Sequence, residues 1–246
     1  EKAYNRLEIY NQKFPENLKK SILQYAVEGK LVEQRPEEGT GEALYQQIQA
    51  EKKKLIQAGK IKKSKKLPEI TEEEIPFEIP ESWKWVRLSS TISLLSGSDL
   101  KPDQYNSLEN GIPYITGASN FNINNLIINR WTTCPKNIAH KGDLLLTCKG
   151  TVGKTTILQQ ESVHIARQIM AITPICIDTV FLKYYIESQV ENLKSKAKSM
   201  IPGIERKNVL TLLFPLPPLA EQKRIVAKIE ELMLLVERCP GVEENN

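Results

Sequence analysis

The sequence lacks long apolar runs, patterned cysteines and an abundance of aromatic residues. No stretch approaches the roughly 18 consecutive apolar residues of a membrane-spanning helix, which argues against such spans. The four cysteines are separated by 14, 28 and 63 residues, none of which is a zinc-binding or redox spacing, so we expect reduced thiols. No apolar leader opens the chain, and the sequence therefore predicts a cytoplasmic protein.

Charge is present in quantity but is distributed unevenly along the 246 residues. Residues 52–66 hold eight lysines and no acid, whereas residues 69–81 hold six glutamates and no base. Between residues 87 and 214 there are 14 basic and nine acidic residues, and after residue 216 acids exceed bases by six to four. A basic middle segment favours a polyanion such as nucleic acid, although a solvated surface explains five extra charges equally well.

The periodicity of apolar residues predicts an α+β protein. Its centre is one mixed α/β globular domain, with long helices able to form coiled coils at both ends. Strand-like runs are expected at 86–88, 114–116, 126–129, 144–148, 155–158 and 168–172. The predicted organisation is a helical spacer region over 1–66, a Pro- and Glu-rich linker or extended arm over 67–82, the globular domain over 83–217 and a C-terminal coiled-coil helix over 218–246.

Two stripes of mainly apolar residues, the first over residues 4–25 and the second over 225–236, define the helix interface that we expect. Pro15 interrupts the first stripe and should begin a new helix or kink the old one. The second stripe advances in alternating steps of four and three residues, which is typical of a coiled-coil seam. A seam this narrow needs a partner to bury it. The residues expected in this interface are Leu18, Ile22, Tyr25, Ile225, Ile229, Leu232 and Val236.

The segment from Gly150 to Thr155 (GTVGKT) superficially matches a phosphate-binding loop. That loop needs a glycine five residues before its second glycine, so that backbone amides can wrap the phosphates. Here the second glycine is Gly153, and the required position is occupied by Cys148. The segment is better explained as a turn between two strands, whose lysines contact a phosphate without catalysis.

Other catalytic constellations are incomplete. The Pro-Pro pair at 217–218 lacks the polar acceptor and the aromatic residue of an amino-methyltransferase loop. Asp103 and Glu205, the carboxylates that a nuclease could use to hold a metal, lie about a hundred residues apart. His140 and His164 have no Ser, Cys or carboxylate at a spacing typical of acid–base catalysis. The three tryptophans are expected in the core rather than as base-stacking platforms. We therefore predict no catalytic residue and no metal site.

Basic and polar residues near predicted turns are the candidates for contact with DNA. Basic side chains position a protein on the phosphates, while polar side chains can hydrogen-bond base edges. The candidates are Lys101, Ser119, Asn120, Lys149, Thr151, Lys154, Arg167, Lys194, Lys198, Arg206 and Lys207.

An ordered set of short motifs covers nearly the whole chain. They are 18–23 (LKKSIL) with Ala26 and 28–31 (EGKL), 75–83 (IPFEIPESW) with Trp85, 141–146 (KGDLLL), 149–154 (KGTVGK), and 215–222 (PLPPLAEQ) leading into 224–226 (RIV). Each is weak alone, but in this order they resemble the specificity subunit of type I restriction–modification systems. Arg167 departs from the pattern, because a small polar residue is expected before Gln168.

The resemblance implies that residues 83–217 are a target-recognition domain that reads one half of a two-part site in double-stranded DNA. It implies helices that dock methyltransferase (modification) subunits, and through them, indirectly, the restriction subunit. S-adenosylmethionine, Mg and ATP are expected on those partners, and no cofactor on this chain. Because only one recognition domain is present, the chain resembles a half-subunit cut within a helix, which a homodimer or a second half-subunit would complete.

Two other functions remain open from the residues alone. A coiled-coil adaptor would use its middle domain to bind protein, ignore DNA and retain its partner at high salt. A small NTPase would use the glycine-rich segment, which the missing glycine disfavours.

Overall fold

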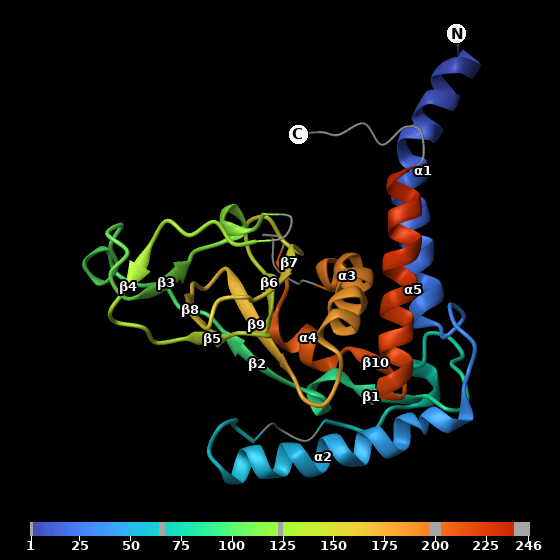
Figure 1. The fold of residues 1–246 in the computed structure, drawn as a ribbon, viewed down its shortest axis with the longest axis horizontal. Helices are drawn as coiled ribbons and strands as arrows, with labels where there is room; N and C mark the ends of the chain where they lie inside the picture. The colour runs from blue at the N-terminus through green and yellow to red at the C-terminus, as the bar shows by residue number, and fades with distance from the viewer. Residues whose placement is uncertain (1, 64–66, 123–124, 197–202, 239–246) are drawn as a thin grey trace.

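The computed structural model describes residues 2–63, 67–122, 125–196 and 203–238, with side chains from Phe14 onward in the first helix. Figure 1 shows a β-rich body beside an upright pair of helices, α1 and α5, with α2 lying across the base. The helices are α1 (Lys2–Val27), α2 (Gly41–Gln57), α3 (Thr179–Ser195), α4 (Arg206–Thr211) and α5 (Leu219–Glu237).

The strands form three sheets within the described residues. They are β1 (Lys84–Arg87), β2 (Ile92–Ser96), β3 (Ile112–Ile115), β4 (Trp131–Thr132), β5 (Ile138–His140), β6 (Leu144–Thr147), β7 (Thr155–Ile157), β8 (Ser162–Ile165), β9 (Ile169–Pro174) and β10 (Leu213–Leu216). The sheet orders are β1-β10, β2-β9-β6-β7 and β4-β3-β8-β5. The β3–β8 pair is parallel, and the other pairs are antiparallel. The mixed helix and sheet architecture agrees with the predicted α+β class, whereas the coiled-coil role of the helices at both ends stays a prediction.

The predicted strands near β1, β3, β6, β7 and β9 are present with shifted ends. The strand expected over 126–129 is wrong, because only Leu126 makes an isolated bridge, to Phe121. The prediction missed β2, β4, β5, β8 and β10. β4 and β5 have only two and three residues, too few for alternation to show, and β10 contains Pro215, which is typical of a loop rather than a strand.

The paired helices α1 and α5 run side by side in opposite directions within one chain (Figure 1). Helix α1 continues through Pro15 rather than ending there. Ile225 and Ile229 of α5 are fully buried in a core that also contains Ile22 of α1 and Leu193 of α3. The seam of α5 is therefore buried inside the chain, so it does not by itself require a second molecule.

The arm formed by residues 67–82 is largely extended, as its prolines predict. It is fastened to β1 at two points. The Arg87 guanidinium pairs with the Glu74 carboxylate at 2.7 Å, and Phe77 packs edge-on against Trp85 with ring centroids 5.0 Å apart. Of the three tryptophans, Trp83 lies in the core, while Trp85 and Trp131 are half-buried.

Candidate nucleic-acid interface

Four turns that are distant in sequence meet at one end of the β-rich body. We call residues 97–101, 116–120, 148–154 and 166–168 the turn cluster. Three backbone hydrogen bonds at or next to the ends of these turns hold the last one beside the others: Ala166 N–H to Ile115 O (2.9 Å), Cys148 N–H to Gln168 O (2.8 Å) and Ser98 N–H to Ile165 O (3.0 Å). The four turns consequently lie beside one another.

The turn between β6 and β7 carries the glycine-rich segment and requires glycine at two positions. Gly150 and Gly153 have φ values of 72° and 94°, in the left-handed region that L side chains rarely adopt. A Cβ on Gly153 would also collide with the side chain of Val190 on α3. This close packing fixes the turn, which presents three exposed side chains to solvent: Lys149, Thr151 and Lys154.

The same geometry does not fit the phosphate-binding loop that the small NTPase alternative requires. A phosphate-binding loop leads into a helix whose N-terminus faces the phosphates. Here Lys154 leads directly into β7, which pairs antiparallel with β6. Cys148 is buried, and its amide is already bonded to the Gln168 carbonyl. The segment is a β-hairpin turn, as the missing glycine indicated.

Asn120 is buried, which corrects the expectation that it reads a base. Its Oδ1 accepts hydrogen bonds from the amides of Thr116 (2.9 Å) and Gly117 (3.2 Å) and from the Thr116 hydroxyl (3.0 Å). Its Nδ2 donates to the Ile127 carbonyl at 2.7 Å. A side-chain amide engaged at both ends shapes the turn and is not available to DNA. The neighbouring Ser119 is exposed and stays a candidate.

Buried aromatic side chains anchor the turn at 97–101. The His164 Nε2 lies 2.9 Å from the Ser98 carbonyl, and its Nδ1 accepts hydrogen bonds from the amides of Lys136 and Asn137, both at 3.2 Å. This pattern requires the neutral tautomer with its proton on Nε2. Burial lowers the pKa of His164, which also favours the neutral ring. His140, in contrast, lies exposed at the end of β5.

Tyr114 supports the same turn from beneath. Its hydroxyl accepts a hydrogen bond from the Leu100 amide at 3.2 Å, and its ring packs against His164 with centroids 5.0 Å apart. Residues on both sides of Asp99 are thus held in place, and Lys101 extends from the turn as an exposed side chain.

Arg167 lies at the tip of the β8–β9 turn and contacts the turn at 97–101. Its Nε lies 2.8 Å from Asp99 Oδ2, and its backbone amide donates to Asp99 Oδ1 at 3.1 Å. Sequence reasoning identified Arg167 but missed Asp99. The two residues are 68 positions apart, and no local pattern signals a contact of that kind.

The remaining basic candidates lie in several places. Arg206, at the start of α4, reaches Ser96 with Nη1 3.3 Å from Oγ, which places it beside the turn cluster. Lys207 borders a cavity of about 830 Å³ that α3, the arm and Trp85 also line. Lys194 pairs with Glu191 at 2.9 Å. Lys198 lies outside the described residues.

The residues expected in the helix interface mostly face the shared core. Ile22, Ile225, Ile229 and Val236 are buried, and Leu18 and Leu232 are half-buried against them. Tyr25 is 55% exposed and lies off this seam, because the helix turn carries it to the solvent side. It is available only to a partner outside the chain.

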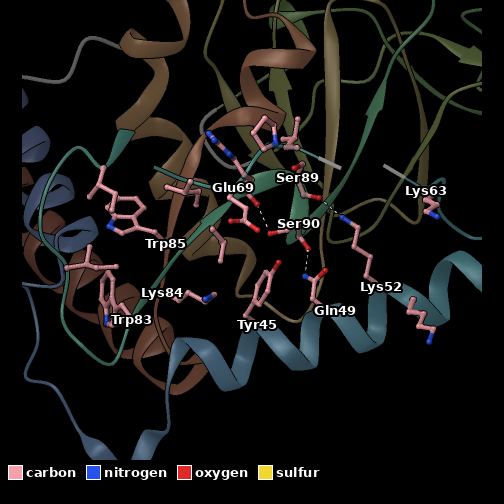
Figure 2. A pocket seen from close by; sticks show the side chains of 18 of the residues that line it. Tyr45, Gln49, Lys52, Lys63, Glu69, Trp83, Lys84, Trp85, Ser89 and Ser90 are labelled. Carbon is pink, nitrogen blue, oxygen red and sulfur yellow. Dashed lines mark hydrogen bonds between the residues drawn. The ribbon is translucent and has the colours of Figure 1, made fainter. Parts of the chain in front are cut away.

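Lys52, the first lysine of the lysine-rich segment 52–66, has a structural role in the interior that its charge did not predict. Lys52 of α2 is buried, and its ammonium group donates to the carbonyl of Ser89 (Figure 2). It also donates to the carbonyl of Ile92 at 3.2 Å. Burial lowers the pKa of Lys52. Gln49, one turn earlier, donates to the Ser90 carbonyl at 3.1 Å. These contacts fasten α2 beside a groove of about 1250 Å³ between the helix and the arm.

No group of three or more metal-ligating side chains gathers among the described residues. The described helices include none that is both long and apolar enough to cross a bilayer.

Comparison with known proteins identifies the family. Residues 80–237 match the type I restriction modification DNA specificity domain. The chain belongs to this family. It is 32% identical over 231 residues to the EcoAI specificity subunit of Escherichia coli, covering 88% of the chain and 39% of that relative. It is 30% identical over 266 aligned positions to the EcoEI specificity subunit of the same organism, covering 98% of the chain and 42% of that relative. The chain thus spans about two fifths of the length of these relatives.

Solved structures agree with this assignment. The HsdS subunit from Thermoanaerobacter tengcongensis matches 99% of the chain and 50% of its own chain, with a TM-score of 0.64 and 23% identity, which shows a shared fold. A chain from a structure that describes complex assembly and conformational transition of the type I R-M system matches 79% of this chain and 47% of its own, with a TM-score of 0.60 and 26% identity.

Proposed function

We propose that this chain is a non-catalytic specificity subunit of a type I restriction–modification complex, and that residues 83–217 read one half of a two-part DNA site. The observation that carries the proposal is the turn cluster. Four turns present exposed polar and basic side chains on one surface, and the family to which the chain belongs is defined by DNA specificity. These side chains are Lys101, Ser119, Lys149, Thr151, Lys154 and Arg167.

In this proposal, some side chains of the turn cluster bind the DNA phosphates and others read the bases. Lys149 and Lys154 extend from a hairpin that the Gly153–Val190 packing holds in place, and no ion pair engages either lysine among the described residues. Free ammonium groups on a fixed turn suit the DNA phosphates, which set position without carrying sequence information. Ser119 and Arg167 have the donors and acceptors that base edges require.

The paired helices α1 and α5 supply the docking part of the proposal. We propose that methyltransferase subunits bind them, and that a homodimer or a second half-subunit extends them to complete a two-part reader. The exposed aromatic side chain of Tyr25, on α1, supports such a partner. Sedimentation that shows a strict monomer at tens of micromolar would count heavily against the homodimer.

The chemistry of the complex belongs to other subunits under this proposal. S-adenosylmethionine serves methyl transfer on the modification subunits, while Mg and ATP serve the restriction subunit. The specificity chain contributes position and sequence selection to both reactions and holds no cofactor. We place it in the cytoplasm, where its DNA substrate lies.

The decisive experiment is selection from a random duplex library by the chain, alone and with its modification subunits, followed by sequencing of the bound fraction. An inverted pair of short motifs at fixed spacing would establish a dimeric reader. A single motif would establish one recognition domain acting alone. No enrichment with the partners present, together with protein binding that persists at high salt, would replace the proposal with the coiled-coil adaptor.

A further inference from the structure

Arg167 is held by Asp99 in a way that leaves one end of its guanidinium group available. Asp99 takes up the Nε with one carboxylate oxygen and the Arg167 backbone amide with the other. Within the described part of the chain, no other acidic side chain pairs with Arg167. The two terminal nitrogens, Nη1 and Nη2, remain as parallel donors on a side chain that is 69% exposed.

We propose that Arg167 reads a guanine in the major groove and that Asp99 is its positioning residue. This inference rests on the proposed function. Guanine is the base that presents two acceptors, O6 and N7, on its major-groove edge, and a bidentate arginine matches both. The donor pair of Arg167 has the required number and spacing of N–H groups.

The position of Asp99 is itself fixed from both sides. The preceding carbonyl, of Ser98, contacts the buried ring of His164, and the following amide, of Leu100, donates to the buried hydroxyl of Tyr114. A carboxylate anchored in this way restricts the rotamers of a long, flexible arginine before DNA arrives. Restricting them in advance removes part of the entropy cost of binding.

The charge of Asp99 also favours a base over a phosphate as the ligand of Arg167. A carboxylate beside the guanidinium repels an approaching phosphate, whereas a guanine edge carries no net charge and meets no such repulsion. Lys149 and Lys154, which have no acidic partner among the described side chains, are the better phosphate ligands. Within the turn cluster, Arg167 is thus held by a carboxylate, whereas Lys149 and Lys154 have no ion-pair partner among the described residues.

The test compares Arg167→Lys and Arg167→Gln with the wild-type chain in the same library selection, each with the modification subunits. The wild-type motif should contain a guanine at one position. Arg167→Gln should lose discrimination there by roughly 5- to 150-fold, with the other positions unchanged. Arg167→Lys, which lacks the planar donor fork held by Asp99, should lose a smaller part of the discrimination at the same position. Arg167→Lys keeps the charge, so its overall binding should be retained. Asp99→Asn should weaken discrimination at the same position only.

Lys141→Gln is the matched control, because Lys141 and Glu161 form a similarly exposed pair, 3.1 Å apart, at the opposite end of β6 and β7. Its motif should equal that of the wild type. A duplex with 7-deazaguanine at the implicated position lacks the N7 acceptor. It should bind the wild-type chain more weakly than the normal duplex does, and should make no difference to Arg167→Gln.

The outcomes separate the two proposals. If the wild-type chain enriches no sequence, the proposed function fails and this inference fails with it. If it enriches a motif that the Arg167 variants leave unchanged, or weaken equally at every position, the function stands and the guanine assignment is overturned.

Discussion

Replacing Ile229 with alanine tests whether the seam of α5 is buried within one chain. Ile229 has no exposed surface and packs in the core shared by α1, α3 and α5. Shortening a buried isoleucine to alanine removes apolar contact and leaves a cavity, which together cost about 2–5 kcal/mol. For a chain of this size, a loss of about 3 kcal/mol lowers Tm by roughly 6–12 °C.

The assay is thermal unfolding, followed by circular dichroism over about a 50-fold range of protein concentration. The control is Leu234→Ala on the same helix, where the side chain is 55% exposed. Truncation there should change stability by less than about 0.5 kcal/mol. The Tm difference between Ile229→Ala and the wild type should be the same at every concentration, because the cavity lies inside one molecule.

Two results would refute this reasoning. One is a destabilisation by Ile229→Ala that is smaller than that by Leu234→Ala. The other is a Tm difference that grows or disappears with dilution, since a seam formed between two copies makes stability depend on concentration.

Three further predictions concern the turn cluster. Lys154→Ala should weaken binding to every duplex and reduce the slope of log K against log salt by about one, measured by fluorescence anisotropy; an unchanged slope would contradict the phosphate contact. Asn120→Ala should cost about 1–3 kcal/mol in denaturant unfolding, and discrimination lost at one base position alone would show instead that Asn120 reads DNA. Burial lowers the pKa of His164 in the folded chain, so on acidification the unfolded chain takes up the proton first. The stability contributed by the neutral ring is therefore present above about pH 6.5, the usual histidine pKa, and is lost as pH falls from there towards the lower pKa of the folded chain. Wild-type stability should therefore fall more steeply than that of His164→Gln between about pH 7 and 5, and parallel curves would refute the role of the neutral ring.

Much of the secondary structure follows from local patterns. The spacing of apolar residues predicted α2, α3 and α5 within a few residues, because each buries one face against the same core. Prolines predicted the extended arm, and the missing glycine at Cys148 predicted a hairpin instead of a phosphate loop. The strands were less predictable. β10, for example, contains Pro215 and is a strand only because it pairs with β1 at the other end of the domain, which no local pattern signals.

In the candidate interface, the exposure of the lysines was predictable, but the engagement of polar groups within the fold was not. Exposed lysines near glycines were identified correctly as surface groups on turns, because lysine rarely buries its charge. Asn120 looks the same in the sequence as an asparagine that reads DNA, yet its side chain makes four hydrogen bonds within the fold. Lys52 looks the same as the other lysines of its tract, yet two carbonyls hold it in the interior.

Local patterns in the sequence were sufficient for the family, the long helices and the excess of basic residues over 87–214, because motif order, periodicity and charge are properties of neighbouring residues. Which cations are paired, which polar groups are hydrogen-bonded within the fold and where the α5 seam is buried depend on the tertiary structure. Asp99 and Arg167 acquire their relation only when β8 pairs beside β3 and the four turns converge. A contact across 68 residues leaves no local pattern, since its energy depends on distances that exist only after folding.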